Sequence, residues 1–467
     1  MNRPLNKNRL LAAVVVAALL ALIIIQITCK TTVAYKGLAF PFGDLTGISS
    51  ASECMKAGIN PYLENPIDPF GRKFNYPPIW LHLADSFHFD RNDVVPVGLT
   101  LIFLFAVTAC FLFKVKNVKQ SLFFLAFFFS PPVLLLLERG NSDSVLFMLV
   151  AFMTIYLPKI RRLNPQVRLY ISAAIIWLSS VLKLYPMVLV PLLILEPVSL
   201  RKRLIVIIGT GLLLLGYLIY SFDVITLITH NTPQPLIMAY GKNVLLEKFF
   251  PDAWIPVVSN GLIVVAIIAV ILLYRKGYDF ISKLYPSDAT ISETVPPFIA
   301  GALLFAGTFA IGNNYMYRLS FLLLTLPHLF EQLKLHAVRK SSENSLLAAS
   351  LLLMVVYGTG FLDFLDDGTW RIIDWCMVGI LPALFVMSLL PYFRKNSQQL
   401  SVKWMPLLTL LQFWMLLLTF YGYRMGEFFI SWYAIMGLAS WGLLISFLVA
   451  ATHFLMLANS KKRTGIN

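Results

Sequence analysis

Apolar segments long enough to cross a lipid bilayer recur along the whole chain. A helix needs about 20 predominantly apolar residues to span the hydrocarbon layer. Fourteen segments reach or approach that length, several of them interrupted by proline, and we expect about 11 to 14 true transmembrane helices. The segments cover residues 10–28, 94–113, 120–137, 142–158, 169–183, 185–198, 204–222, 255–274, 297–312, 318–330, 345–362, 372–392, 404–422 and 428–458.

The composition supports this interpretation. Of the 467 residues, 58% are hydrophobic and only 13% are charged, which is about half the usual charged share of a soluble domain. A soluble protein of this size needs more polar surface to cover its core. We therefore predict an all-α integral membrane protein. The net charge of +15 does not indicate a nucleic-acid partner, because the basic residues are spread over short loops.

The basic residues alternate between the two sides of the expected membrane. If the N-terminus is cytoplasmic, every second loop is basic, and the inner side carries 25 of the 38 basic and 6 of the 23 acidic residues. The outer side then carries 13 basic and 17 acidic residues. Because cytoplasmic loops are enriched in Lys and Arg, this pattern predicts a multi-pass protein of the inner (plasma) membrane with both termini in the cytoplasm.

Neither the cysteines nor the histidines indicate a cofactor. The 4 cysteines are too few for a disulfide framework, although Cys29 and Cys54 both fall on the outer side and could pair. Cys110 and Cys376 lie within or near spans and are expected to be packing residues. The chain has no CxxC, HExxH, P-loop or dinucleotide motif, so we predict neither a metal nor another cofactor.

The longest outer loop, residues 30–93, is expected to carry function, because the other connections are mostly short. It contains two short segments that we expect to be helices at the membrane surface. The first runs from about Leu45 to Ala57 and stops at Gly58. A turn at Asn60-Pro61-Tyr62 follows, and Pro78 begins a second helix over residues 79–87.

Asp44 lies just before the first expected helix, and its position allows two roles. As an N-cap, its carboxylate would accept hydrogen bonds from free backbone N–H groups. As a general base at the outer membrane face, it would take a proton from a substrate. The two roles are compatible, because a base held at the start of a helix is well oriented.

Three polar clusters lie at the outer ends of apolar segments, where polar groups are costly and need a reason. Residues 138–143 form either a hairpin turn with a local Glu–Arg pair or the lining of a polar pocket. Lys183 either extends to the membrane interface or binds a phosphate. Residues 313–318 form either a polar turn within an aromatic belt or a site in which Arg318 binds a phosphate. Together the clusters place Arg139, Lys183 and Arg318 on the outer side, where acidic residues otherwise predominate.

An ordered set of motifs covers residues 40–190. The motifs are Gly43-Asp44, Gly58-Ile59-Asn60-Pro61-Tyr62, Tyr76-Pro77-Pro78, Arg139-Gly140-Asn141 with Asp143, and Leu182-Lys183-Leu184-Tyr185-Pro186. The set resembles a known class of membrane enzymes, the multi-spanning glycosyltransferases of the GT-C fold. It is most similar to glycosyltransferase family 87, which includes bacterial polyprenol-phosphate-mannose-dependent mannosyltransferases. A later segment, Tyr317-Arg318-Leu319, is similar to a motif of related membrane proteins.

The resemblance implies a GT-C-like helical bundle that moves a hexose or pentose from a polyprenyl-phosphate-linked donor to a glycolipid or glycan acceptor at the extracytoplasmic face. Asp44 is implied as the catalytic base of a single displacement, which inverts the anomeric carbon. Arg139, Lys183 or Arg318 would stabilise the departing lipid phosphate. The side chains expected to bind substrate are Tyr62, Tyr76, Asn141, Asp143, Tyr185, Asn314 and Tyr317.

The chain is expected to form a single membrane domain, residues 1–467. Within it, residues 1–222 would be the N-terminal catalytic module, and residues 223–467 a more variable set of C-terminal helices. Two other classes remain open. A transporter or flippase of lipid-linked sugars would share the spans and the outer basic residues, although internal inverted repeats would be expected of it. A glycan polymerase or ligase would differ mainly in the size of its donor.

Overall fold

The computed structural model describes residues 42–113, 127–128, 130–160, 162–233, 239–244, 246–248, 250–276, 292–328, 331 and 428–460. This part of the chain is mostly helical. The apolar segments predicted at 10–28, 345–362, 372–392 and 404–422 lie outside the described residues, as do Cys29 and Cys376. The predicted number of spans therefore stays a prediction.

Four helices of the described part are long and apolar enough to cross a membrane, which suggests a bilayer environment. A fifth span is formed if two helices bent by 115° are counted as one. The four are α4 (Val94–Leu112, extended at its start by η1, Arg91–Asp93), α8 (Pro165–Leu182), α9 (Leu200–Tyr220) and α11 (Ile255–Lys276). The bent pair is α6 (Pro131–Glu138) with α7 (Asp143–Ala151), which continues as η2 (Phe152–Tyr156) and η3 (Leu157–Lys159).

Two of the apolar segments wind into 3₁₀ helices rather than α-helices, a difference that hydropathy does not reveal. These are η4 (Tyr185–Leu195) and η6 (Met316–Leu324). At about 2.0 Å of rise per residue, the 11 residues of η4 extend about 22 Å, which is short of the about 30 Å hydrocarbon layer. In η4, Pro191 lies inside the helix and removes a backbone donor. The segment predicted at 185–198 is therefore one of the short, proline-interrupted members of the expected set.

The two helices expected over residues 45–57 and 79–87 are confirmed, while their position at the outer membrane surface stays a prediction. The first is α2 (Gly43–Lys56) and the second is α3 (Ile79–Ser86). Gly58 follows the end of α2 with φ +77°, a conformation that glycine adopts without strain. The predicted turn is also present, because the backbone N–H of Tyr62 donates to the Asn60 side chain at 3.0 Å.

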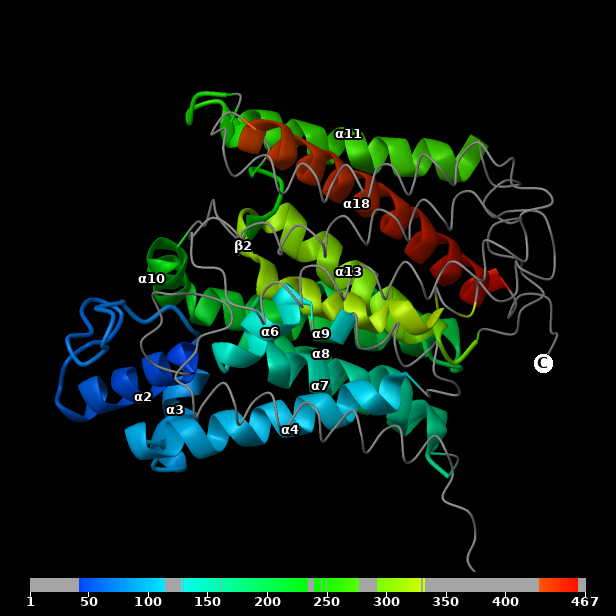
Figure 1. The fold of residues 1–467 in the computed structure, drawn as a ribbon. Coiled ribbons are helices and arrows are strands. Elements are labelled where there is room, and N and C mark those ends of the chain that lie inside the picture. The colour runs from blue at the N-terminus through cyan, green and yellow to red at the C-terminus, as the bar shows by residue number, and fades with distance from the viewer. Residues whose placement is uncertain are drawn as a thin grey trace, which may run out of the picture.

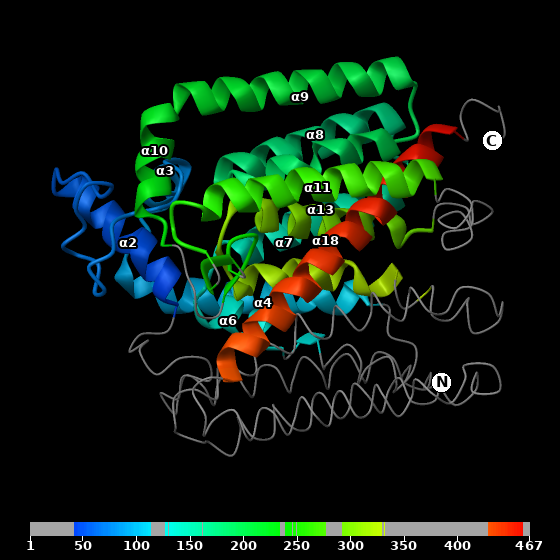
Figure 2. The same ribbon diagram turned by 90° about the horizontal axis from the view of Figure 1, so that it is seen from above.

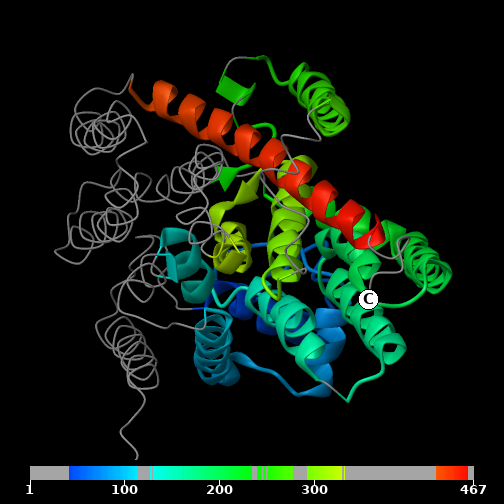
Figure 3. The ribbon, with the colours of Figure 1, turned by 90° about the vertical axis from the view of Figure 1, so that its right-hand side faces the viewer.

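The long helices run side by side, and the elements of the first outer loop gather at one end of them (Figures 1 and 2). The short helix α10 (Phe222–Asn231) lies at the same end. Helix α18 (Phe428–Ser460) crosses obliquely over α13 (Val295–Ile311) and α11 (Figure 3). A small antiparallel sheet joins β1 (Ala239–Tyr240) to β2 (Asn314–Tyr315), and η5 (Leu246–Lys248) follows β1.

Candidate functional site

The start of α2 is joined to the break between α6 and α7 by two backbone hydrogen bonds. The N–H of Phe42 donates to the carbonyl of Glu138 at 2.8 Å, and the N–H of Asp44 donates to the carbonyl of Arg139 at 2.9 Å. These bonds satisfy N–H groups that a helix start otherwise leaves unpaired. They also place the side chains of Asp44 and Arg139 beside each other.

Gly140 makes this close approach possible. It has φ +58°, and a Cβ at this position would lie 2.9 Å from Cδ1 of Leu45 on α2. Any other residue would suffer both backbone strain and a steric clash. On the other side, the ring of Phe42 packs directly against Gly98 of α4. Gly98 on α4 and Gly140 in the break between α6 and α7 therefore let the start of α2 sit in its place.

The Asp44 carboxylate is buried, with 4% of the residue exposed, and basic side chains surround it. Arg139 donates to both of its oxygens, Nε to Oδ2 at 3.0 Å and Nη2 to Oδ1 at 2.7 Å. Asn141 donates to Oδ2, and Nη1 of Arg72 lies 3.6 Å from Oδ1. The N-cap interpretation is wrong, because Phe42 occupies the cap position and Asp44 pairs with side chains from distant parts of the chain.

These neighbours keep Asp44 ionised. Burial alone would raise the pKa of the carboxyl, but the charges of Arg139 and Arg72 and the hydrogen bonds from Arg139 and Asn141 outweigh it and lower the pKa. Arg139 turns toward α2 and pairs with Asp44, and it is the residue of the 138–143 segment that lines the polar cavity. Asn141 and Asp143 of the same segment support the cavity wall from behind.

Lys183 points into the same polar region. Its backbone is extended after the end of α8, and its Nζ donates to Oδ1 of Asn141 at 2.9 Å and to Oδ1 of Asp143. Nε of Arg318 lies 3.7 Å from Oδ2 of Asp143, so two basic side chains share one carboxylate. Only 8% of Lys183 is exposed. Lys183 is therefore buried and paired with Asp143 and does not extend into solvent.

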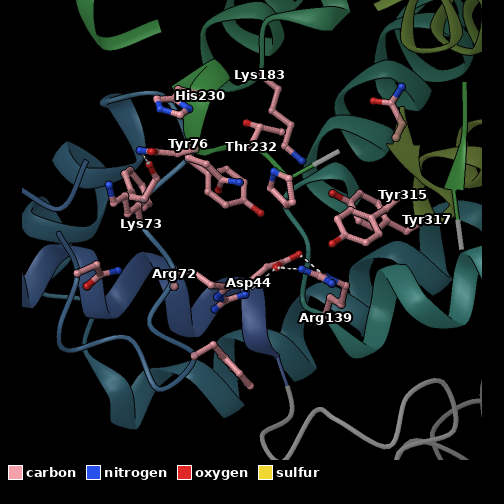
Figure 4. A pocket seen from close by; sticks show the side chains of 18 of the residues that line it. Asp44, Arg72, Lys73, Tyr76, Arg139, Lys183, His230, Thr232, Tyr315 and Tyr317 are labelled. Atoms are coloured by element: carbon pink, nitrogen blue, oxygen red, sulfur yellow. Dashed lines mark hydrogen bonds and ion pairs between the residues drawn. The ribbon is translucent and has the colours of Figure 1, made fainter. Parts of the chain in front are cut away.

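Asp44, Arg139, Lys183 and Arg318 line a cavity of about 550 Å³. Asp44 and Arg139 lie on one wall of it, Lys183 reaches in from another, and Tyr315 and Tyr317 lie beside them (Figure 4). Five basic residues and one acidic residue line the cavity, which makes it suited to an anion. The lining residues are Asp44, Gly47, Asn65, Phe70, Arg72, Lys73, Phe74, Asn75, Tyr76, Arg139, Lys183, His230, Asn231, Thr232, Pro233, Asn313, Asn314, Tyr315, Tyr317 and Arg318.

Most of the site residues predicted from sequence thus meet at one place. Four of those expected to bind substrate lie behind the lining: Tyr62, Asn141, Asp143 and Tyr185. Tyr62 donates from its hydroxyl to the carbonyl of Tyr76 at 2.9 Å, and the ring of Tyr185 lies 5.1 Å from the guanidinium carbon of Arg318. In this structure they support lining residues and do not face the cavity themselves.

Sequence reasoning missed Arg72. Its guanidinium donates to Asp68 and to the carbonyl of Gly43 at 2.6 Å, and it lies against Gly47, where a Cβ would be 3.3 Å from Nη2. The sequence does contain a pattern that favours an ordered turn here, because Asp68 and Arg72 are four positions apart with Gly71 between them. In the structure Gly71 has φ +62°.

The segment His230–Pro233 was also missed. Asn231 donates to the carbonyls of Tyr62 and Phe74 at 2.8 and 3.1 Å, which ties the end of α10 to the first outer loop. In the same loop, Cys54 donates to Asn65 at 3.1 Å. No local signal in the sequence marks these contacts, because their partners are distant or depend on the loop path.

Comparisons of the chain with protein-family models, with curated proteins and with solved structures found no match. Within the described residues, no group of three or more His, Cys, Asp or Glu side chains is arranged to hold a metal ion.

Proposed function

We propose that this chain is a membrane glycosyltransferase of GT-C type, which moves a hexose or pentose from a polyprenyl-phosphate donor to a hydroxyl of a glycolipid or glycan at the extracytoplasmic face. One observation carries the proposal: a buried carboxylate, Asp44, shares a cavity with five basic side chains at one end of a set of apolar helices. A lipid-linked sugar phosphate needs those three features, which are a base, a cationic site and an apolar surface for its tail.

The ion pairs favour Lys183 and Arg318 as the ligands of the phosphate. Arg139 is committed to Asp44. Lys183 and Arg318 share Asp143, which leaves one positive charge in excess at that side of the cavity. Lys183 has three N–H groups and uses two of them on Asn141 and Asp143. The third can bind a phosphate oxygen without breaking either bond.

The proposed reaction is a single displacement. An acceptor hydroxyl oxygen forms a bond to the anomeric carbon, and the bond from that carbon to the phosphate oxygen breaks. The electron pair leaves with the lipid phosphate, where Lys183 and Arg318 stabilise the added charge. The hydroxyl proton passes to Asp44. Oδ1 is the suitable oxygen, because Oδ2 already accepts from both Arg139 and Asn141, whereas Oδ1 accepts one hydrogen bond and has Arg72 at 3.6 Å.

The test is sugar transfer by the purified protein in lipid nanodiscs. Hexosyl and pentosyl polyprenyl phosphates labelled in the sugar are incubated with a panel of glycolipid and glycan acceptors. We expect transfer by the wild type and loss of at least about 100-fold for Asp44→Asn, a typical contribution of general-base catalysis. The control is Asp85→Asn, which removes an exposed carboxylate of α3 that pairs only loosely with Lys56 at 3.9 Å.

Two results would overturn the proposal. The first is an Asp44→Asn variant that is fully active, which would remove Asp44 from the chemistry. The second is a wild type that moves the lipid-linked sugar across a vesicle bilayer without transferring the sugar, which would support a transporter.

A further inference from the structure

Asn141 uses the full hydrogen-bonding capacity of its side chain within the protein. Its Nδ2 donates to Oδ2 of Asp44 and lies 3.3 Å from the Tyr76 hydroxyl. Its Oδ1 accepts from Nζ of Lys183 at 2.9 Å and from the backbone N–H of Asp143 at 2.9 Å. A carboxamide offers two donors and two acceptor sites, so no position is left for a substrate.

The orientation of this amide is dictated by its neighbours. One end faces a carboxylate, which can only accept, and the other faces an ammonium group, which can only donate. An amide turned the other way would set its oxygen against Asp44 and its nitrogen against Lys183. Asn141 is 0% exposed, and its backbone carbonyl also accepts from the Ser144 hydroxyl at 2.8 Å. The start of α7 therefore holds the side chain in one place.

We infer that Asn141 is a positioning residue that joins the Asp44 carboxylate and the Lys183 ammonium in one hydrogen-bonded unit. The inference rests on the proposed function, in which Asp44 is the base and Lys183 binds the phosphate. In this inference the Asn141 amide fixes Asp44 and Lys183 relative to each other and does not contact the sugar. One rigid side chain then sets the distance between the base, Asp44, and the phosphate ligand, Lys183. A single displacement requires such a fixed distance, because the two groups act on opposite sides of the reacting carbon.

The sharpest test is Asn141→Asp, which keeps the shape of the side chain and its acceptor toward Lys183. It replaces the donor facing Asp44 with a second carboxylate oxygen. Two carboxyl groups at this distance hold a shared proton, so the pair binds a proton more tightly than Asp44 alone. In the pH profile of kcat/KM for sugar transfer, we expect the acid limb to move upward by at least about one pH unit. A residue that only packs would lower the rate without moving that limb.

The matched control is Asn75→Asp. Asn75 is half-buried and lines the same cavity, so this variant adds the same negative charge without replacing the donor to Asp44. We expect its acid limb to stay within a few tenths of a pH unit of the wild type. Equal shifts in the two variants would show a general effect of charge and would overturn the inference.

A second measurement does not depend on catalysis. In Asn141→Asp the shared proton raises a carboxyl pKa above its unfolded value, so stability is lost as pH rises and regained as pH falls. The difference in melting temperature between this variant and the wild type should therefore narrow from about pH 8 to about pH 5. Asn141→Ala removes the donor without adding a carboxyl group, so its difference in melting temperature from the wild type should not narrow as pH falls. This variant serves as the comparison if Asn141→Asp folds poorly at neutral pH.

The two proposals fail in different ways. One outcome is that the wild type transfers no sugar while the difference in melting temperature between Asn141→Asp and the wild type narrows at low pH as expected. In that case the proposed function is wrong and the hydrogen-bonded unit stands. If the wild type transfers sugar and neither the acid limb nor the melting temperature of Asn141→Asp responds to pH, the role of Asn141 is wrong and the proposed function stands.

Discussion

The guanidinium of Arg139 holds the carboxylate of Asp44 through two parallel hydrogen bonds, from Nε to Oδ2 at 3.0 Å and from Nη2 to Oδ1 at 2.7 Å. The two residues are 95 positions apart in the chain. Such two-pronged pairs specify geometry as well as charge. This pair connects the start of α2 to the break between α6 and α7, and the position of the proposed base depends on it.

Replacement of Arg139 should destabilise the protein strongly. Arg139→Ala leaves the buried Asp44 carboxylate without its main partner, and we expect a loss of about 3 to 5 kcal/mol in the free energy of unfolding. Lys56→Ala is the control, because Lys56 is exposed and its contact to Asp85 is 3.9 Å; it should cost less than about 1 kcal/mol. Thermal unfolding in detergent or nanodiscs measures both. Similar melting temperatures for the two variants would show that the buried pair is not required.

The contribution of Asp44 to stability should depend on pH. Its neighbours lower the pKa of the folded carboxyl below the unfolded value, which is about 3.9. A depressed pKa stabilises the folded state above the unfolded value, and this stabilisation is lost as pH falls through the folded pKa. The melting temperature of Asp44→Asn should therefore lie below that of the wild type at neutral pH and approach it below about pH 4. If the difference in melting temperature between Asp44→Asn and the wild type widened on acidification, the lowered pKa of Asp44 would be contradicted.

Two glycines with left-handed backbones should respond differently to alanine. Gly140 has φ +58°, and a Cβ there would lie 2.9 Å from Leu45, whereas Gly58 has φ +77° and would meet nothing within 4 Å. Gly58→Ala should cost only the backbone strain, about 1 to 2 kcal/mol. Gly140→Ala should cost more, because α2 must also shift away from the break, and sugar transfer should fall with it. Unfolding and sugar-transfer assays on both variants test this. An equal loss of free energy of unfolding would contradict the expectation, because the clash with Leu45 would then not destabilise the protein.

The proposed phosphate site predicts a loss of anion affinity in two variants. Lys183→Gln and Arg318→Gln should each weaken binding of a short prenyl phosphate, farnesyl phosphate, by about tenfold or more, which is about 1.4 kcal/mol. Lys202→Gln is the control, because Lys202 is exposed at the start of α9 and bonds to Gln166. Isothermal titration at two salt concentrations measures the affinities. Unchanged affinity in both cavity variants would place the phosphate elsewhere.

The features that the sequence determined are local or periodic. The end of α2 at Lys56, the glycine at position 58 and the turn at Asn60 depend on residues within a few positions of one another. The apolar segments at α4, α8, α9 and α11 follow from length and hydropathy alone, because a bilayer span needs nothing more. The apolar segment at 185–198 was predicted, but its winding as the 3₁₀ helix η4 was not, since hydropathy does not distinguish a 3₁₀ helix from an α-helix.

The partners of the charged residues were decided only by the tertiary structure. From the sequence alone, Asp44, Arg139 and Lys183 could be assigned to the same side of the membrane, but not to one another. A helix start, a glycine in the left-handed region and the break between α6 and α7 bring Asp44 against Arg139, while Lys183 turns inward to Asn141 and Asp143. Pairing over 40 to 95 positions depends on how the helices pack. The sequence alone therefore predicted which polar residues gather at one end of the helices, and packing determined which of them face the cavity and which support it from behind.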